Sequence, residues 1–540
     1  MRNKRIAFIL LAALFVLPLE AAIKKPVKVA GGLLSGVPGK DPSVAVFKGI
    51  PYAAPPIGDL RWRNPQPAKA WSGVRKADTF GPSCAQSAPQ SFGPYTSEFL
   101  IAPEPISEDC LALNVWTAAK SSSERRPVYV FIHGGGFGSG SGAIPIYDGE
   151  GLAKKGIVVV TINYRVSMFG FLAHPELTKE SPFKASGNYG TLDLIAALRW
   201  VQENIKAFGG DPTRVTIGGQ SAGAMAVHDL IASPLAKGLF HGAIIESGES
   251  TLGGSGISIS TPSLAEGEEY GLKFAQSKGA HSLAELRALS WQKLVEPVQD
   301  SQAATRASGM PATLRFMPII DGYFLTALEE KVMAQGKQND VVILTGYNSG
   351  EIAGSILGPQ EPPTAESYAK EARQRYGDMA DEFLKLYPAT TDEEARIAKA
   401  QSQRDQTLAS MYLWAKLRAR TSKTKAFLYL WDHTLPGPDS QKWGAFHTAE
   451  IPYVMNTLSH MPDRPFTEVD RKIADMMSSY WANFIATGDP NGKGLPSWPA
   501  VGEKPEVMEV GDLNQPVSVS GSSAKFAFFE KFLVQSIKNK

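Results

Sequence analysis

Cysteine and histidine are scarce in this chain. Its 540 residues contain two cysteines and eight histidines, and none of their spacings is typical of a metal site. We therefore expect no metal centre, and we predict no organic cofactor. So few cysteines also argue against a heavily disulfide-bridged ectodomain.

Excess charge, low-complexity linkers and internal repeats are missing as well. The formal net charge is +2 and no basic run is interleaved with aromatic residues, so nucleic acid is excluded as a partner. Length alone suggests roughly three or four domains. Because nothing in the composition divides the chain, we predict one large domain over residues 23–540.

The chain has no apolar run long enough for a comfortable membrane span, which needs about 20 residues. The longest run, Ile6 to Leu17, has a dozen residues, follows three basic residues and precedes the small pair Ala21-Ala22. This pattern predicts that residues 1–22 are a secretory signal peptide and that the protein is secreted or periplasmic. An uncleaved membrane anchor is the alternative, but we expect no stable membrane span.

A short motif suggests a nucleophile. Gly219-Gln220-Ser221-Ala222-Gly223 stands between the strand-like run 215–217 and a helical pattern that opens at Ala224. A Gly-x-Ser-x-Gly match alone is a weak signal, but a strand–turn–helix context is typical of a nucleophile elbow. The turn would present Ser221 above the carboxyl edge of a sheet, with a helix N-terminus beneath it.

A glycine-rich stretch supplies a candidate oxyanion hole. Ile132-His133-Gly134-Gly135-Gly136-Phe137 follows the apolar run 128–131. Consecutive glycines let backbone N–H groups turn toward one point, so we predict that Gly135, Gly136 and Ala222 bind the developing negative oxygen. A phosphate-binding loop is the alternative, but no Lys-Ser/Thr follows and no acidic partner is present.

Together with further segments, these motifs resemble the type-B carboxylesterase, or cholinesterase-like, family of α/β-hydrolases. The similarity runs from about Val29 to the C-terminal region. Its other segments are 47–53 (FKGIPYA), 107–115 (SEDCLALNV), 187–190 (GNYG) and 207–212 (AFGGDP). The resemblance implies a doubly wound, mostly parallel central sheet with helices on both faces, and inserted loops and helices that roof an active-site gorge.

Hydrophobic periodicity gives a coarse map of this fold. Residues 31–51 are predicted as N-terminal hairpin strands, and 192–207 as an amphipathic helix. The predicted central strands are 128–132, 157–162, 215–217, 242–247, 341–347 and 425–431. Residues 85–105 and 249–318 are expected to roof the gorge and to influence specificity.

The resemblance assigns the catalytic acid to Glu351. This residue follows the run 341–347 at the carboxyl end of a predicted buried strand, where open α/β sheets place functional groups. From the residues alone, Asp321 and Asp340 are almost equal candidates.

The resemblance assigns the catalytic base to His447, in a loop-like stretch ahead of an apolar segment. His433 is the alternative, because it also follows a strand-like run, 426–431. Many relatives have glycine where Thr448 stands, which predicts a slight change in the shape of this loop. Ser247 matches a family serine near the active site, and we predict that it donates or accepts hydrogen bonds there without acting as a nucleophile.

Two departures from the family pattern favour a neutral substrate. Most relatives carry glutamate where this chain has Gln220, so negative potential near the base is lost. The segment 85–109 contains no tryptophan, whereas cholinesterases place their choline-stacking indole there. The sequence therefore predicts a hydrolase of neutral esters and not a cholinesterase.

The same resemblance pairs Cys84 with Cys110 as a disulfide. Closing the intervening loop is worth about 3 to 4 kcal/mol in the chain-entropy model. Two unpaired buried thiols are the alternative, and export to an oxidising compartment favours the disulfide.

The predicted function is that of a serine carboxylesterase whose Ser-His-Glu triad, Ser221, His447 and Glu351, forms an acyl-enzyme with a small-molecule ester. A lipase is one alternative, but the roof segments show no strongly apolar helix for a lid. A non-catalytic binding protein is the other, since some relatives have lost the nucleophile. All three residues are present in this chain.

Overall fold

The computed structural model describes residues 23, 25–88, 90–248, 261–297, 316–351, 362–438 and 440–538. The predicted signal peptide, residues 1–22, lies outside them. No helix within the described ranges is both long and apolar enough to cross a membrane.

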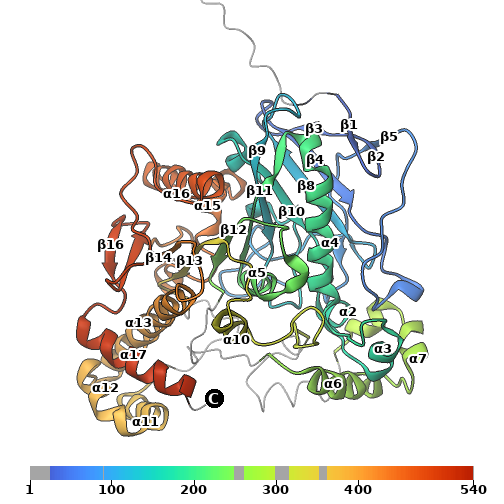
Figure 1. The fold of residues 1–540 in the computed structure, drawn as a ribbon. Coiled ribbons are helices and arrows are strands. Elements are labelled where there is room, and N and C mark those ends of the chain that lie inside the picture. Colours follow the sequence, from blue (N-terminus) through green and yellow to red (C-terminus); the bar gives the residue numbers. More distant parts are fainter. Residues whose placement is uncertain are drawn as a thin grey trace, which may run out of the picture.

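A large sheet forms the centre of the described chain (Figure 1). Its strands are β3 (Val37–Pro38), β4 (Ala45–Pro51), β8 (Ala112–Thr117), β9 (Arg126–Ile132), β10 (Val158–Ile162), β11 (Gly210–Gln220), β12 (Gly242–Glu246), β13 (Val342–Asn348), β14 (Ala426–Trp431), β15 (Glu506–Val510) and β16 (Gln515–Ser518). These 11 strands lie in the order β16-β15-β14-β13-β12-β11-β9-β10-β8-β4-β3. Neighbours from β15 through β10 are parallel, and both edges are antiparallel. The predicted mostly parallel sheet is confirmed.

Helices cover both faces of the sheet, which is why its central strands are apolar on both sides. The residues of β9 alternate between two cores. Val128, Val130 and Ile132 pack with residues of α4 (Tyr189–Asn204) and α5 (Ala222–Ala232). Tyr129 and Phe131 pack on the other face with residues of α1 (Glu150–Lys154), α15 (Ile451–Val454) and α16 (Glu468–Thr487).

Each predicted central strand corresponds to an observed one, and the predicted helix 192–207 corresponds to α4 and the turn after it. The predicted hairpin 31–51 divides between two sheets. The β3 and β4 strands pair in the large sheet, whereas β2 (Gly32–Ser35) joins β1 (Val27–Val29) and β5 (Val74–Lys76) in a small separate one.

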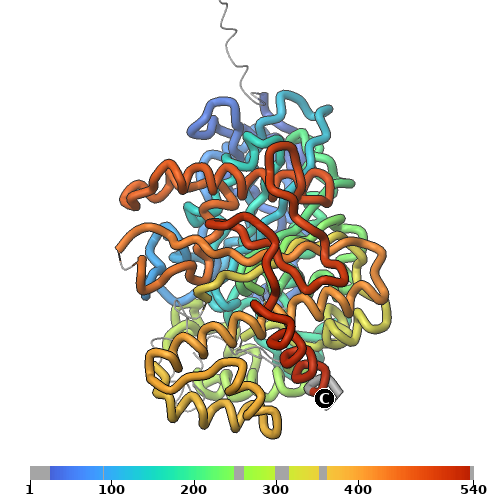
Figure 2. Tube along the Cα trace, turned by 90° about the vertical axis from the view of Figure 1, so that its left-hand side faces the viewer, coloured from blue at the N-terminus to red at the C-terminus, as the bar shows by residue number. Residues whose placement is uncertain are grey.

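The remaining α-helices of the described residues lie around this core. Near the middle of the chain they are α2 (Ser167–Phe171), α3 (Pro175–Glu180), α6 (Leu264–Ser277), α7 (Leu283–Ala288), α8 (Trp291–Val295) and α10 (Glu329–Ala334). Toward the C-terminus they are α11 (Ala365–Tyr376), α12 (Ala380–Leu386), α13 (Asp392–Arg418), α14 (Ser440–Trp443) and α17 (Ser523–Lys538). Figure 2 shows α11, α12 and α17 gathered at one end of the molecule. The rings of Tyr376, Phe383 and Phe528 from these three helices pack together. Residues 249–260 and 298–315 of the predicted roof lie outside the described residues.

Candidate active site

Ser221 occupies a sharp turn between β11 and α5. Its φ of 59° and ψ of −125° lie in a region that is strained for a residue with a side chain. A Cβ on Gly223 would lie 2.1 Å from the carbonyl oxygen of Ile132. Helix α5 therefore packs directly on the end of β9 only because position 223 has no side chain. This is the strand–turn–helix geometry that the motif predicts.

The glycine loop after β9 lies against this turn. Gly135 and Gly136 have φ values of 110° and 62°, and a Cβ on Gly134 would be 3.0 Å from the Cβ of Ser221. The N–H of Ala222 begins α5 and has no partner within the helix. The loop and the helix start that carry the predicted oxyanion donors thus meet at Ser221.

A buried pair of rings supports the glycine loop. His133 stacks on Tyr164 with 4.4 Å between ring centroids, and Tyr164 Oη donates to the carbonyl oxygen of His133 at 2.9 Å. Burial lowers the pKa of His133 to about 4. This histidine is therefore neutral near pH 7 and has a structural position beneath the loop.

The predicted acid and base come together from loops that are 96 residues apart. Glu351 follows the carboxyl end of β13, and its Oε2 forms a hydrogen bond with Nδ1 of His447. The other carboxylate oxygen, Oε1, accepts from the backbone N–H of Asn348 at 3.0 Å. Both oxygens of Glu351 are thus held.

The second ring nitrogen of His447 faces the elbow. Its Nε2 lies 3.0 Å from the side-chain nitrogen of Gln220, the residue before Ser221. An amide nitrogen can only donate, so Nε2 is the acceptor and the ring proton is assigned to Nδ1, facing Glu351. Among the described residues, no hydrogen bond joins Nε2 to the hydroxyl of Ser221, and Gln220 holds that nitrogen instead.

The electrostatic environment makes His447 a stronger base than an ordinary histidine. Burial alone would lower its pKa, but the charge of Glu351, the hydrogen bond to it and the charge of Glu450 together raise the pKa above 6.5. A base in this state gains a proton readily and holds it more firmly than free imidazole.

Two more buried carboxyl groups lie close to the predicted triad. Glu450 accepts from the side-chain amide of Asn348 at 2.5 Å, and burial with the charge of Glu351 raises its pKa to about 7. Glu246, at the end of β12, accepts from Trp481 at 2.8 Å. Burial and the charge of Glu450 raise the pKa of Glu246 well above its ordinary value.

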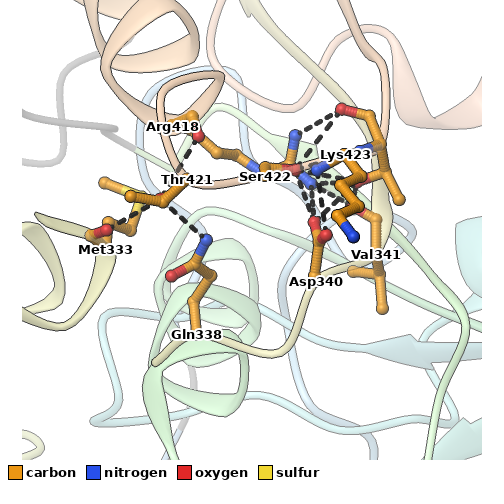
Figure 3. A network of polar contacts seen from close by, with 9 residues as sticks. Met333, Gln338, Asp340, Val341, Arg418, Thr421, Ser422 and Lys423 are labelled. Atoms are coloured by element: carbon orange, nitrogen blue, oxygen red, sulfur yellow. Dashed lines mark hydrogen bonds and ion pairs between the residues drawn. The ribbon is translucent and has the colours of Figure 1, made fainter. Parts of the chain in front are cut away.

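The two alternative acids have structural partners. Asp340 precedes β13, at the opposite end of that strand from Glu351, and accepts from Arg418 at 3.2 Å and from the N–H of Lys423 at 3.0 Å (Figure 3). Asp321 accepts from three successive backbone N–H groups, those of residues 323–325. Both carboxylates therefore stabilise local backbone.

The alternative base, His433, is also bonded to acids. Its Nδ1 lies 2.6 Å from Asp512 and its Nε2 lies 3.2 Å from Asp470. Both ring nitrogens are occupied by carboxylates, so this histidine does not present a nitrogen to Ser221.

The predicted disulfide between Cys84 and Cys110 is present. It closes a loop that contains Tyr95, whose Oη donates to the carbonyl oxygen of His447 at 3.0 Å. Tyr95 also packs edge-on against Phe446, with 5.7 Å between ring centroids. The disulfide-bounded loop thus contacts the loop of the predicted base.

Two further predictions concern residues near the predicted triad. Thr448 has a φ of 83°, a backbone conformation that favours glycine, and the predicted change in the shape of its loop stays a prediction. Ser247 donates its N–H to the carbonyl oxygen of Gly346 at 3.0 Å. Its hydroxyl is buried without a partner among the described residues, and its hydrogen-bonding role stays a prediction.

Sequence reasoning missed the roles of two residues that hold these loops. Asn348 bonds Glu351 and Glu450, and Tyr95 bonds the backbone of His447. The position of Asn348 at the carboxyl end of a predicted strand was a usable signal. No sequence signal identifies Tyr95, because its contact depends on a distant loop.

Comparison with known proteins places the chain in a family. The sequence pattern of the carboxylesterase family matches residues 24–529. The chain is 36% identical to fumonisin B1 esterase from Sphingopyxis macrogoltabida, over 94% of this chain and 90% of that protein. It is 32% identical to human cocaine esterase, with 94% and 90% covered, and 33% identical to para-nitrobenzyl esterase from Bacillus subtilis, with 85% and 89% covered. The chain therefore belongs to the carboxylesterase family and is a carboxylic ester hydrolase with the α/β-hydrolase fold.

Proposed function

We propose that Ser221, His447 and Glu351 are the catalytic triad of a serine esterase that hydrolyses neutral carboxylic esters. The observation that carries the proposal is the double attachment of His447. Its Nδ1 bonds Glu351, and its Nε2 bonds the residue beside Ser221. One nitrogen is held by an acid and the other lies beside the residue that precedes Ser221, which supports a role for His447 as the general base of that serine.

In the acylation step, Nε2 of His447 takes the proton of Ser221 while Oγ bonds to the ester carbonyl carbon. The carbonyl oxygen becomes negative and accepts hydrogen bonds from the N–H groups of the glycine loop and of Ala222. The tetrahedral intermediate then re-forms the carbonyl and expels the alcohol oxygen, which receives the proton from His447. Glu351 keeps the ring oriented and stabilises the imidazolium.

Deacylation repeats the cycle with water. His447 takes a proton from water, the hydroxide oxygen bonds to the acyl carbon, and the intermediate releases the carboxylic acid while Ser221 regains its proton.

For each proton transfer the amide of Gln220 has to turn away from Nε2 of His447, because that nitrogen has a single lone pair. Gln220 is therefore in competition with the nucleophile for the base.

Two features support a neutral ester. Gln220, fully buried, brings an uncharged amide to the position where most relatives are expected to carry a carboxylate. Three aromatic residues lie in the described part of the 85–109 loop. Tyr95 and Phe99 are fully buried, and Phe92 is substantially exposed. The two buried rings are packed inside the protein and cannot enclose a quaternary ammonium group. The relatives are named for three different compounds, so the substrate is best sought with a panel of different esters.

The first test concerns the nucleophile. A fluorophosphonate probe should label the peptide that carries Ser221, and the Ser221→Ala variant should lose both labelling and about 10³-fold or more of kcat on a neutral aryl ester, with thermal unfolding unchanged. Labelling at another serine, or retention of more than a few per cent of activity, would reject the triad. An ester panel that varies acyl length and alcohol bulk would then define the substrate class.

We also propose that residues 1–22 direct export and are removed. The basic start and short apolar run support this. N-terminal sequencing of protein recovered from the periplasm or medium should begin near Ile23. A mature chain that begins at Met1 would contradict the proposal.

A further inference from the structure

We propose that Asn348 is a positioning residue that aligns the catalytic acid with the loop of the catalytic base, and that Glu450 is its buried anchor. The inference rests on the proposed roles of Ser221, His447 and Glu351. Asn348 is the last residue of β13 and is completely buried. It holds both sides of the acid–base pair.

The backbone of Asn348 fixes the acid. Its N–H donates to Oε1 of Glu351 at 3.0 Å, while Oε2 of the same carboxylate is bonded to His447. With one oxygen held by the strand end and the other by the ring, the carboxylate cannot rotate without losing a hydrogen bond. The plane of the imidazole is therefore linked to the end of β13.

The side chain of Asn348 fixes the loop of the base. Its Nδ2 donates to the carbonyl oxygen of Phe446 at 2.8 Å and to Oε2 of Glu450 at 2.5 Å. These two acceptors lie on either side of His447 in the sequence. Because the carbonyl oxygen of Phe446 can only accept, the amide has one satisfactory orientation, and both of its hydrogens are used.

Two other contacts hold the same loops, but neither bonds the carboxylate of Glu351. The N–H of Gly350 donates to the carbonyl oxygen of Ala445 at 3.0 Å, and Tyr95 bonds the backbone of His447. A Cβ on Gly350 would lie 2.8 Å from the carbonyl oxygen of Ala445, so the two loops touch. Asn348 differs because it bonds the acid with its backbone and the base's loop with its side chain.

Aspartate at position 348 would reverse this arrangement. The ionised side chain of an Asn348→Asp variant has no donor, and it would place a carboxylate against Glu450 and the carbonyl oxygen of Phe446. The loop would then move away from β13 and take His447 with it. Displacements of about 1 Å at a catalytic group cost on the order of 100-fold in rate, with less effect on substrate binding.

The experiment compares Asn348→Asp, Glu450→Gln and the double variant on a neutral aryl ester. We expect N348D to lower kcat about 100-fold with KM within threefold. E450Q keeps an acceptor for Asn348, so kcat should stay within fivefold of wild type. The apparent pKa of His447 should fall in E450Q, because the negative charge of Glu450, which raises that pKa, is removed. The kcat of the double variant should be about tenfold higher than that of N348D, because the amide introduced by E450Q can donate to the carboxylate introduced by N348D.

Asn339→Asp is the matched control. Asn339 lies just before β13 and its Nδ2 donates to the carbonyl oxygens of Leu230, Ile231 and Ser233 at 3.0, 3.2 and 2.9 Å. Losing these bonds should lower the thermal midpoint without changing kcat or the pH profile. If N348D proves too unstable to purify, Asn348→Ser retains one donor and should show an intermediate loss of kcat.

Three results would overturn the inference. They are a folded N348D with kcat within threefold of wild type, a double variant no more active than N348D, or an N339D variant with the same kinetic defect. Ser221→Ala is measured in parallel. If it is inactive while N348D is fully active, only this inference fails; if Ser221→Ala remains active, the proposed triad fails and the inference fails with it.

Discussion

The two histidines that follow β14 have similar burial and acidic partners but differ at the second ring nitrogen. His433 and His447 have the same side-chain exposure, 15%, and each contacts a carboxylate. His433 has acids on both nitrogens, whereas His447 has an acid on Nδ1 and the neutral amide of Gln220 on Nε2. Burial and a carboxylate partner are thus common to both histidines, and our proposal of His447 as the base depends on the partner of its second nitrogen.

The surroundings of the two histidines differ in the same way. Asp470, beside His433, also accepts from the N–H of Thr467 at 2.7 Å and from Tyr453 Oη at 2.8 Å, as part of the N-terminal cap of α16. His433 therefore ties the end of β14 to a helix start. The partners of His447 lie instead at the carboxyl ends of β11 and β13, next to the turn that carries Ser221.

The largest expected effect compares the two histidines directly. His447→Ala should lower kcat/KM on a neutral aryl ester by about 10³- to 10⁴-fold, because the base and its oriented proton are lost. His433→Ala should leave kcat/KM within fivefold and lower the free energy of unfolding by about 1–2 kcal/mol through lost hydrogen bonds. Steady-state kinetics of both variants measure kcat/KM, and chemical denaturation measures their free energies of unfolding. The opposite pattern would identify His433 as the base.

A smaller effect comes from giving His447 a second acid, as His433 has. Gln220→Glu places a carboxylate beside Nε2 of His447, so it should raise the apparent pKa of the base further above 6.5 and move the acidic limb of kcat/KM to higher pH. An effective coupling of about 1 kcal/mol corresponds to roughly 0.7 pH units. It should also improve kcat/KM for a choline ester about fivefold relative to its neutral isostere.

Gln220→Met is the control for that change, because it removes the amide without adding charge. It should leave the choline preference unchanged, and any shift of its pH profile should be smaller than that of Gln220→Glu. Wild-type preference for the choline ester, or a Gln220→Glu enzyme with an unchanged profile and ratio, would show that position 220 has no electrostatic influence on the base.

The sequence predicted the parts of the site that depend on short stretches of chain. The elbow and glycine loop are set by adjacent residues, because steric limits on Gly223 and the positive φ of Gly135 are local properties. Assigning Glu351 and His447 required the family resemblance, because a loop carboxylate and a loop histidine have no local signature. From the residues alone, Asp321 and Asp340 were almost equal candidates for the acid, and His433 also followed a strand-like run.

The missed features depend on contacts between distant segments. The backbone N–H of Asn348 meets Glu351 nearby, but its side chain reaches a loop 98 residues away. Tyr95 meets His447 across 352 residues. Strand β8 and the edge strands β15 and β16 were also not predicted. Side-chain direction and the register of loops are determined by packing, which residue pattern alone does not specify.

The smallest prediction uses the threonine that follows each histidine. Thr448 has a φ of 83°, whereas Thr434 is not among the residues with positive φ. Glycine relieves strain at a positive φ but adds entropy to the unfolded chain elsewhere. The glycine and alanine variants at one position both lack the threonine side chain, so the difference between their stabilities does not include its loss. The Thr448→Gly variant should therefore be more stable than Thr448→Ala by about 1 kcal/mol, whereas Thr434→Gly should be less stable than Thr434→Ala by about 0.5–1 kcal/mol. Urea denaturation of the four variants measures both differences, and the same sign at both positions would show that the loop of His447 relaxes its backbone to suit threonine.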